Sequence, residues 1–437
     1  MRLDTDKIME DLENSCDEIK KAYLIEIKRK NIPAMFHFGC YYQYNEKNYD
    51  EMKKYYLMAI KHKNTNAMFY LGYYYQYVEK NYTEMKKYYL MAIKLKNTKA
   101  MFNLGIYYNN VEKNYDKMKK YYLMAIKFKN TNAMFNLGNY CKEVEKNYDE
   151  MKKYYLMAIK LKNTSAMFNL GNYYEKVEKN YNEMKKYYLM AIELKSPYAM
   201  YNLGHYYKTI EENYDEMKKY YLMAIELNYS DAMNDLGCYY YSIKYYIEMK
   251  KYYLMAIELK NSDAMYNLGH YYQDIEKNYN QMKKYYLMAI ELNDVDSINS
   301  LAEHYCYVEK NYDEMKKYYL IGIKLNDCNS MIDLGFYYKT IEKNYDEVKK
   351  YYLMSIELNN TEGLEMFCEF YSIEIQHYLL KKCKSEIAKN KIDKLEKNNF
   401  LGIKIFKNLT EYCFNPKRML KLCNDYGIEF MDYVDLL

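Results

Sequence analysis

The sequence contains few residues that break or bend a chain. Its 437 residues include 3 prolines, 13 glycines and no tryptophan. A many-stranded β architecture needs turn residues such as Gly and Pro every few positions, so these counts exclude it. Arginine is nearly absent as well, occurring only at Arg2, Arg29 and Arg418, which argues against recognition of phosphates or bases by guanidinium groups. The remainder is rich in Tyr, Met and Lys, and this composition favours a chain that is nearly all helix.

Long apolar runs and paired cysteines are missing too. No stretch approaches the ~18 consecutive apolar residues of a membrane span, and the first residues show no secretory signal. The net charge of +5 is too small to demand a polyanionic partner. Ten cysteines show no C-x-x-C motif and no period, as expected for free thiols in a reducing compartment. We therefore expect a soluble, intracellular protein of the cytoplasm, or of a host cell's cytoplasm if the source is a virus.

The sequence is dominated by one internal repeat. Lys-Lys-Tyr-Tyr occurs ten times with successive spacings of 33 residues, except for one spacing of 32. The copies begin at Lys53, Lys86, Lys119, Lys152, Lys185, Lys218, Lys250, Lys283, Lys316 and Lys349. Self-similarity at this period predicts a solenoid of stacked units.

Each repeat predicts two helices. In the copy at residues 133–165, apolar residues recur at the i, i+3, i+4 and i+7 spacing of an α-helix in two separate stretches. They are Met134, Leu137, Gly138, Cys141 and Val144 in the first stretch, and Met151, Tyr154, Tyr155, Ala158 and Ile159 in the second. Between them, Asn147 followed by Glu150 predicts a capping box at the start of the second helix. Neither helix can bury its apolar stripe alone, so the units must stack.

The expected fold class is therefore all-α, an α-solenoid of about eleven stacked antiparallel helix pairs. We expect residues 1–15 to form an N-terminal leader or cap, residues 16–376 the repeat solenoid, and residues 377–437 a helical C-terminal cap or tail. A cap is the simpler expectation for the last segment, because the end of a solenoid exposes an apolar face.

The repeat resembles a known family. The pattern A-x-x-x-L-G-x-x-Y, followed by [ND]-Y-x-x-[AM]-x-x-Y-Y-x-x-A-I, is similar to the Sel1-like repeat of the tetratricopeptide-repeat superfamily. In one copy it comprises Ala264, Leu268, Gly269, Tyr272, Asn278, Tyr279, Met282, Tyr285, Tyr286, Ala289 and Ile290. Two departures from the family are a missing Gly-rich loop between the helices and Met in place of a small second-helix Ala. The resemblance implies a curved array of helix pairs that assembles other proteins, and it implies no chemistry.

Candidate binding residues follow from the positions around the Leu-Gly pair. The resemblance implies that the first helix of each pair lines a concave face. The residue before Leu-Gly is asparagine in five copies, at Asn103, Asn136, Asn169, Asn202 and Asn267. An amide both donates and accepts hydrogen bonds, which suits an extended peptide backbone. The alternative is that these amides bond to a neighbouring helix or face solvent.

The residue after the glycine varies among otherwise similar copies, as a specificity position would. Our candidates at this position are Asn139, Asn172, His205 and His270. His205 and His270 lie two repeats apart, too far to share a metal ion. None of the six histidines has a metal-ligand spacing, and no P-loop or catalytic triad order occurs. We expect no catalytic, cofactor-binding or metal site, and hence no enzyme.

These observations predict a non-enzymatic scaffold or adaptor that binds a protein or extended peptide on its concave face. The alternative is an RNA-binding helical-repeat protein, since tyrosines could stack on bases. We do not expect a nucleic-acid partner, because Glu51 and its equivalents are placed to neutralise the second lysine of each pair and the tyrosines fall on the core stripe. Self-association is left open by a repeated Leu-Met pair, as at Leu57-Met58, which we expect to be buried rather than an exposed apolar ridge.

Overall fold

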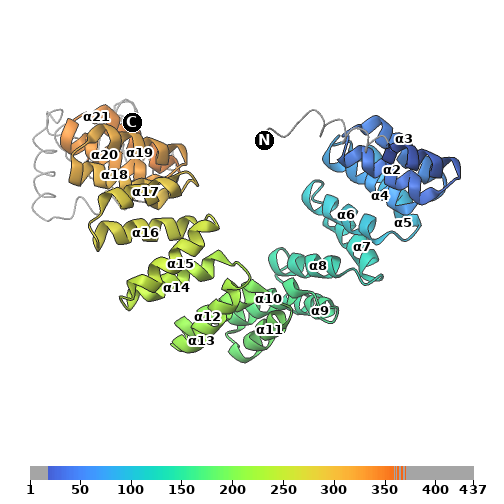
Figure 1. The fold of residues 1–437 in the computed structure, drawn as a ribbon, viewed down its shortest axis with the longest axis horizontal. Helices are drawn as coiled ribbons and strands as arrows, with labels where there is room; N and C mark the ends of the chain where they lie inside the picture. The colour runs from blue at the N-terminus through green and yellow to red at the C-terminus, as the bar shows by residue number, and fades with distance from the viewer. Residues whose placement is uncertain (1–17, 359, 361, 364–365, 368–369, 371–437) are drawn as a thin grey trace, which may run out of the picture. The chain divides into compact units, whose positions relative to one another are not determined.

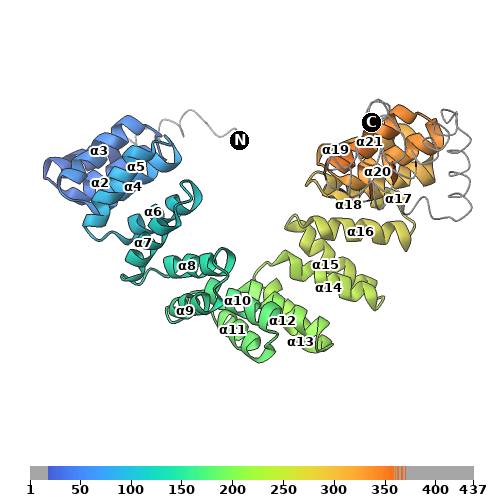
Figure 2. The ribbon, with the colours of Figure 1, turned by 180° about the vertical axis from the view of Figure 1, so that it is seen from behind.

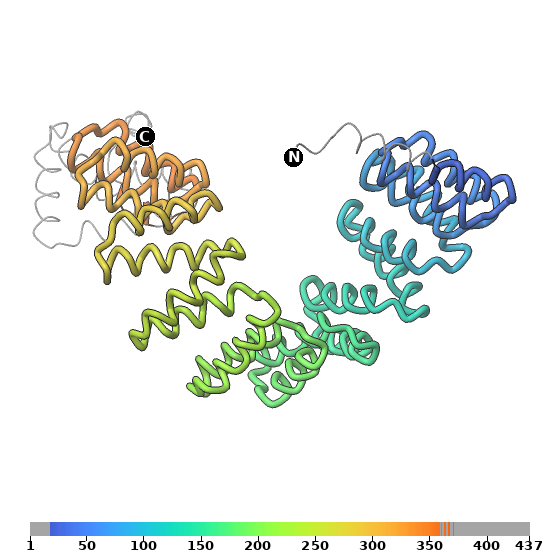
Figure 3. Tube along the Cα trace, in the orientation of Figure 1, coloured from blue at the N-terminus to red at the C-terminus, as the bar shows by residue number. Residues whose placement is uncertain are grey.

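The computed structural model describes residues 18–358, 360, 362, 363, 366, 367 and 370 (Figure 1). Throughout these residues the chain consists of helices and short connections, without a strand. It divides into two compact units, residues 1–229 and 230–437. The predicted domain boundaries, the leader and the C-terminal cap lie outside the described residues. Within each unit, consecutive helices pack as antiparallel pairs in chain order, which Figures 2 and 3 show from two sides.

Unit 1 contains six complete helix pairs within its described part. The pairs are α2 (Ile32–Tyr44) with α3 (Tyr49–Lys61), α4 (Thr65–Tyr77) with α5 (Tyr82–Lys94), α6 (Thr98–Asn110) with α7 (Tyr115–Ile126), α8 (Thr131–Glu143) with α9 (Tyr148–Ile159), α10 (Thr164–Tyr173) with α11 (Tyr181–Glu193), and α12 (Pro197–Thr209) with α13 (Tyr214–Ile225). The π-helical turn η1 (Tyr174–Glu178) extends α10.

Unit 2 continues the same arrangement with four described pairs. They are α14 (Ser230–Ser242) with α15 (Tyr246–Glu258), α16 (Ser262–Asp274) with α17 (Tyr279–Ile290), α18 (Val295–Glu303) with α19 (Tyr312–Lys324), and α20 (Cys328–Tyr337) with α21 (Tyr345–Glu357). The π-helical turns η2 (His304–Glu309) and η3 (Tyr338–Glu342) extend α18 and α20.

Polar side chains start nearly every helix. The Oδ1 atom of Asn147 accepts the backbone N–H of Glu150 at 3.1 Å, which satisfies an N–H that has no partner within α9. The predicted capping box is only half formed, because the Glu150 carboxylate bonds to Lys153 at 2.9 Å instead of reaching back to the cap. Asn163 caps α10 in the same way, through the N–H of Ala166 at 2.8 Å. The exception among the second helices is α15, whose cap residue Tyr245 makes no side-chain bond.

Lysine closes the turns where glycine would be usual. Lys146, between α8 and α9, and Lys162, after α9, adopt left-handed backbone angles with φ of 53° and 59°. Asn228, Asn293 and Asn326 occupy the equivalent left-handed position in three other repeats. A short turn therefore replaces the missing Gly-rich loop, and it contains a non-glycine residue in the sterically strained left-handed conformation.

The core follows the predicted stripes with one error. Met134, Leu137 and Cys141 on α8 and Met151 on α9 are all buried. Val144 is 52% exposed, so its predicted burial is wrong. The helix ends at Glu143 and Val144 is its C-cap, which turns its side chain out of the stripe.

Both lysines of each Lys-Lys pair have acidic partners in most repeats. The second lysine pairs within its helix as predicted, for example Lys153 with Glu150 at 2.9 Å. The first lysine reaches the turn of the next pair, as Lys152 does to Glu178 at 2.9 Å. Equivalent inter-pair contacts join Lys20 to Glu46, Lys53 to Glu79, Lys86 to Glu112, Lys119 to Glu145, Lys185 to Glu211, Lys250 to Glu276, Lys283 to Glu309, and Lys316 to Glu342.

The Leu-Met pairs divide between two environments. The methionines, such as Met58 and Met91, are half-buried against the core. The leucines stay about two-fifths exposed, with Leu57 at 40% and Leu222 at 42%. The predicted burial of the whole Leu-Met pair is therefore wrong for the leucine, because only the methionine packs against the core.

Candidate functional site

The first helices of the pairs form a continuous surface within each unit, which we call the first-helix face. In unit 1, α6, α8 and α10 lie on one side of the array and their partners α7, α9 and α11 on the other (Figure 1). All nine predicted site residues lie on first helices.

The asparagines before Leu-Gly are half-buried, and most of them bond to the preceding pair. Asn136 donates to the hydroxyl of Tyr122 at 3.4 Å, and Asn103 donates to Tyr89 at the same distance. Such bonds lie at the long limit for this geometry and occupy only one N–H of each amide. Asn169 has no hydrogen bond within the described residues.

Two further asparagines donate to other asparagine side chains. Asn202 donates to Asn172 at 3.3 Å, and Asn267 donates to Asn234 at 2.9 Å. The alternative, in which these amides bond to a neighbouring helix, is therefore correct for part of their hydrogen-bonding capacity.

The residues after the glycine fall into two groups. Asn139 and Asn172 are half-buried and accept the hydroxyls of Tyr155 and Tyr188 from the second helix of their own pairs. His205 is exposed on α12. The ring of His270 lies 3.3 Å from the carboxylate of Asp274, one turn further along α16.

A hollow of about 290 Å³ brings two predicted residues together. Asn136 and Asn139 line it from α8, together with Tyr122 from α7. The other lining residues are Asn109, Tyr140, Glu143 and Val144. Burial raises the pKa of Tyr122 above its ordinary value. The hollow thus offers amide and hydroxyl groups beside an aromatic wall, a combination that suits an uncharged peptide segment.

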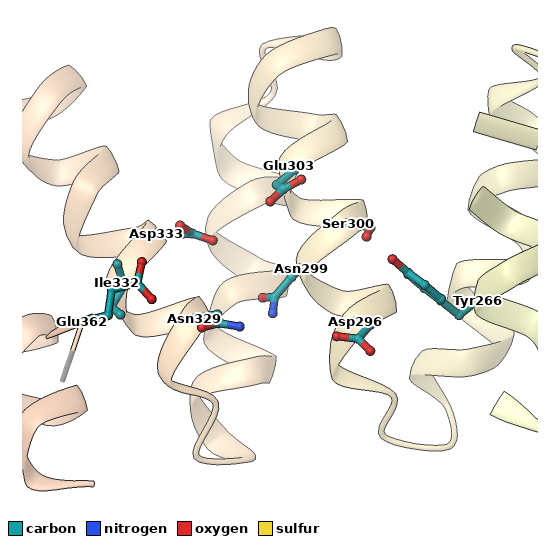
Figure 4. A pocket seen from close by; sticks show the side chains of 9 residues that line it. All are labelled: Tyr266, Asp296, Asn299, Ser300, Glu303, Asn329, Ile332, Asp333 and Glu362. Atoms are coloured by element: carbon teal, nitrogen blue, oxygen red, sulfur yellow. The ribbon is translucent and has the colours of Figure 1, made fainter. Parts of the chain in front are cut away.

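Unit 2 has a second hollow, of about 260 Å³, with a different chemistry (Figure 4). Its lining comprises Tyr266, Asp296, Asn299, Ser300, Glu303, Asn329, Ile332, Asp333 and Glu362. Burial first, and then the nearby Glu303, Asp327 and Glu362 carboxylates, raise the pKa of Asp333 to about 6. Burial also raises the pKa of Glu303. We call this surface the acidic hollow.

The acidic hollow is not among the sites predicted from the sequence, although a signal for it exists. Asp333 occupies the position held by Asn136 in its own repeat, and Glu303 occupies the position held by Asn139. Acidic residues at both variable positions in adjacent repeats indicate a local change of charge on the first-helix face. The signal becomes readable only once the neighbouring first helices are known to lie side by side.

We also searched the described residues for metal sites, disulfides and membrane-spanning helices. No three His, Cys, Asp or Glu side chains in the described part of the chain are placed to hold a metal ion. Cys40, Cys141, Cys238, Cys306 and Cys328 form no disulfide among these residues. None of the helices that the structure describes combines the length and apolar character needed to cross a membrane.

Comparisons with known proteins give structural likeness only. No protein-family model matches the chain, and no curated protein does. A Sel1 repeat protein from Oxalobacter formigenes is 16% identical, matches over 65% of this chain and 90% of its own, and superposes with a TM-score of 0.52. A protective antigen of uropathogenic Escherichia coli with an SLR fold is 20% identical over 93% of this chain and 94% of its own, with a TM-score of 0.49. Human IFIT1, solved as a dimer with PPP-AAAA, is 18% identical over 81% of this chain and 88% of its own, with a TM-score of 0.39.

Proposed function

We propose, on the premise that this chain is an all-α solenoid with the Sel1-like repeat fold, that it is a non-enzymatic scaffold. It binds a protein partner through an extended peptide segment on the first-helix face of unit 1. The observation that carries this proposal is the hollow shared by Asn136, Asn139 and Tyr122. Donors and acceptors lie there beside an aromatic ring, without a charged cluster that would demand an ionic ligand.

The repeat spacing also suits an extended segment. Packed helices lie ~8–10 Å apart, while an extended chain advances ~3.3 Å per residue. Each helix pair therefore meets a new stretch of a few peptide residues, and an asparagine at a fixed place in successive first helices can bond to the backbone at regular intervals. Asn103, Asn136, Asn169 and Asn202 occupy that place in four consecutive pairs.

RNA binding is less well supported. The second tyrosine of the repeat, such as Tyr155 or Tyr188, is fully buried and presents no face on which a base could stack. The repeated lysines are largely consumed by carboxylates, both within helices and between pairs, as in Lys153–Glu150 and Lys152–Glu178. A phosphate backbone would have to displace these partners.

The test is affinity capture from the lysate of the native host, followed by mass spectrometry, with and without nuclease. The wild-type chain is compared with Asn136→Ala/Asn169→Ala/Asn202→Ala. We expect one or a few proteins to be captured by the wild type and lost in this variant, with circular dichroism showing that both remain folded.

A matched control changes the opposite side of the same pairs. Leu156→Gln/Leu189→Gln/Leu222→Gln alters three leucines that are 39–42% exposed on second helices. This variant is expected to retain the partner. Loss of capture here, with retention in the asparagine variant, would move the binding surface to the second helices. Capture that disappears with nuclease would favour RNA.

A further inference from the structure

The carboxylates of the acidic hollow have no cationic partner in the part of the chain that the structure describes. Asp296 and Glu303 on α18, Asp333 on α20 and Glu362 beyond α21 line it together (Figure 4). None of these four side chains forms an ion pair with any residue that the structure describes. Asp296, Glu303 and Glu362 are exposed, while Asp333 is half-buried. Like charges gathered in one hollow repel one another, and the pKa of Asp333 is raised first by burial and then by Glu303, Asp327 and Glu362.

The hollow differs in this respect from the rest of the array. Carboxylates on the second helices and in the turns are repeatedly paired with lysine, as Glu150 is with Lys153 and Glu342 with Lys316. In unit 1, the positions equivalent to Asp333 and Glu303 hold neutral side chains, Asn136 and Asn139 among them. The fold therefore does not require acidic residues at these two repeat positions. Where they are grouped in unit 2, the first-helix face is suited to a cationic occupant.

A cationic occupant is present in the same chain. Residues 381–421 contain twelve Lys and Arg but only four Asp and Glu. The basic residues are Lys381, Lys382, Lys384, Lys389, Lys391, Lys394, Lys397, Lys404, Lys407, Lys417, Arg418 and Lys421. We call residues 381–421 the basic segment. Its charge comes from the sequence alone, because the segment lies outside the described residues.

The chain between Phe370 and the basic segment is long enough for the segment to reach the acidic hollow. Phe370 is the last described residue, and Lys381 follows eleven positions later. Eleven residues span up to ~36–40 Å when extended, whereas the hollow is lined by Glu362, which precedes Phe370 by only eight residues. The chain that leaves unit 2 thus starts beside the hollow and carries positive charge within easy reach of it.

We propose that the basic segment docks on the acidic hollow of its own chain, with lysine ammonium groups against the carboxylates of Asp296, Glu303, Asp333 and Glu362. Docking places the segment along the first-helix face of unit 2, where it excludes any other cationic ligand. This inference goes beyond the scaffold function proposed above and is independent of it, because it concerns a different unit and an occupant within the chain.

Zero-length coupling with a water-soluble carbodiimide tests the proposal on the full-length chain. The reagent joins an amine to a carboxylate only where the two are already in contact. We expect amide links between lysines of the basic segment and Asp296, Glu303 or Glu362, found by mass spectrometry in the monomeric fraction. About 0.5 M salt reduces their yield several-fold, because it screens exposed charges.

Two variants make the assignment specific. Asp296→Asn/Glu303→Gln/Asp333→Asn/Glu362→Gln removes the four carboxylates that the reagent would activate, so the readout is coupling of the basic segment to the carboxylates that remain within residues 296–362. Release of the segment is expected to lower that yield at least about fivefold. The matched control Glu150→Gln/Glu183→Gln/Glu216→Gln/Glu314→Gln removes as many carboxylates from paired positions and is expected to leave the links unchanged. Circular dichroism checks that each variant folds.

Reversal of charge provides a check that does not depend on removing carboxylates. Lys389→Glu/Lys391→Glu/Lys394→Glu/Lys397→Glu is expected to abolish the links. Combining it with Asp296→Lys/Glu303→Lys is expected to restore coupling, now between the new lysines of the hollow and the new glutamates of the basic segment. The absence of links in the wild type would overturn the proposal. Links confined to a dimeric fraction would also overturn it, since they would assign the hollow to a second copy. Neither result would affect the asparagine test of the scaffold function.

Discussion

The ring of Tyr155 lies where a side chain on Gly138 would have to be. A Cβ added to Gly138 would stand 2.6 Å from both Cδ1 and Cε1 of that ring, which is fully buried and has no room to withdraw. The same relationship recurs between Gly171 and Tyr188 in the next pair. The glycine backbone of the first helix thus contacts the tyrosine ring of the second helix, and this contact determines how closely the two helices pack.

Gly138→Ala tests the contact. Alanine gains about 1 kcal/mol of helix propensity over glycine, while overpacking of a core costs about 1–3 kcal/mol. We expect net destabilisation of about 1–2 kcal/mol, measured as a lower midpoint in urea denaturation followed by circular dichroism. Ala302, which occupies this position opposite Tyr319, provides the reverse change: Ala302→Gly is expected to cost about 1 kcal/mol. A higher midpoint for Gly138→Ala would show that helix propensity alone governs the site.

Tyr245→Asn is expected to stabilise unit 2. Tyr245 is the N-cap of α15, makes no side-chain bond to the helix and is 60% exposed, so its removal costs little. An asparagine there restores the cap that the other second helices have and is worth about 1 kcal/mol. The expected result is a rise in the thermal midpoint of about 2–4 °C for a unit of this size. Tyr245→Ala serves as the control, and a similar rise there would contradict a capping effect.

The ion pair between Lys152 and Glu178 is expected to stabilise unit 1 in a pH-dependent manner. The hydrogen bond from Lys152 lowers the pKa of the Glu178 carboxyl. A depressed pKa contributes stability above the unfolded pKa of about 4.5, and this contribution is lost as the pH falls through the folded value. Glu178→Gln is therefore expected to cost about 1 kcal/mol at pH 7 and nothing near pH 3.

The control for this pair is Glu150→Gln, which removes a carboxylate that bonds only within its own helix. Its expected cost at pH 7 is about 0.3 kcal/mol. Urea denaturation at the two pH values measures both variants. Equal costs for Glu178 and Glu150 would show that linking successive pairs adds nothing to stability.

Asp333→Asn has the opposite dependence on pH. Burial first, and then the carboxylates of Glu303, Asp327 and Glu362, raise the pKa of Asp333 to about 6. A raised carboxyl pKa means that the native state binds the proton more tightly, so stability falls as the pH rises from about 4 to about 6. In about 0.5 M salt, which screens the basic segment from the hollow, we expect the substitution to stabilise the chain by about 1–3 kcal/mol at pH 7 and to leave it unchanged at pH 3.

Asp296→Asn, at an exposed position of the same hollow, is the control and is expected to change stability by less than about 0.5 kcal/mol. A destabilised Asp333→Asn at pH 7 would indicate that the carboxylate has a partner that outweighs the repulsion. Thermal denaturation at the two pH values distinguishes these results.

Features that depend on one repeat alone could be predicted from the sequence. The helix pairs, the asparagine cap at Asn147 and the pairing of Lys153 with Glu150 all act over three or four residues, and the structure confirms them. The buried tyrosines also follow from local periodicity. The Sel1-like resemblance predicted the fold correctly, since most repeats carry the pattern within their own residues.

Features that depend on how one pair meets the next could not be predicted. Whether Leu57 or Met58 enters the core is decided by the rotation of the adjacent second helix. The pairing of Lys152 with Glu178 joins residues 26 positions apart, a distance at which sequence spacing gives no guide. The helical pattern of the sequence extends to Val144, whereas the left-handed turn at Lys146 ends α8 one residue earlier.

The glycine–tyrosine contacts within pairs and the lysine–glutamate contacts between pairs are shorter in sequence than the repeat itself. Gly138 meets Tyr155 across 17 positions and Lys152 meets Glu178 across 26, both within one period of 33. Removal or duplication of one whole period in the gene therefore joins every contact to an equivalent partner. Unequal recombination between the near-identical coding repeats can lengthen or shorten this protein in a single step, and the junction still folds.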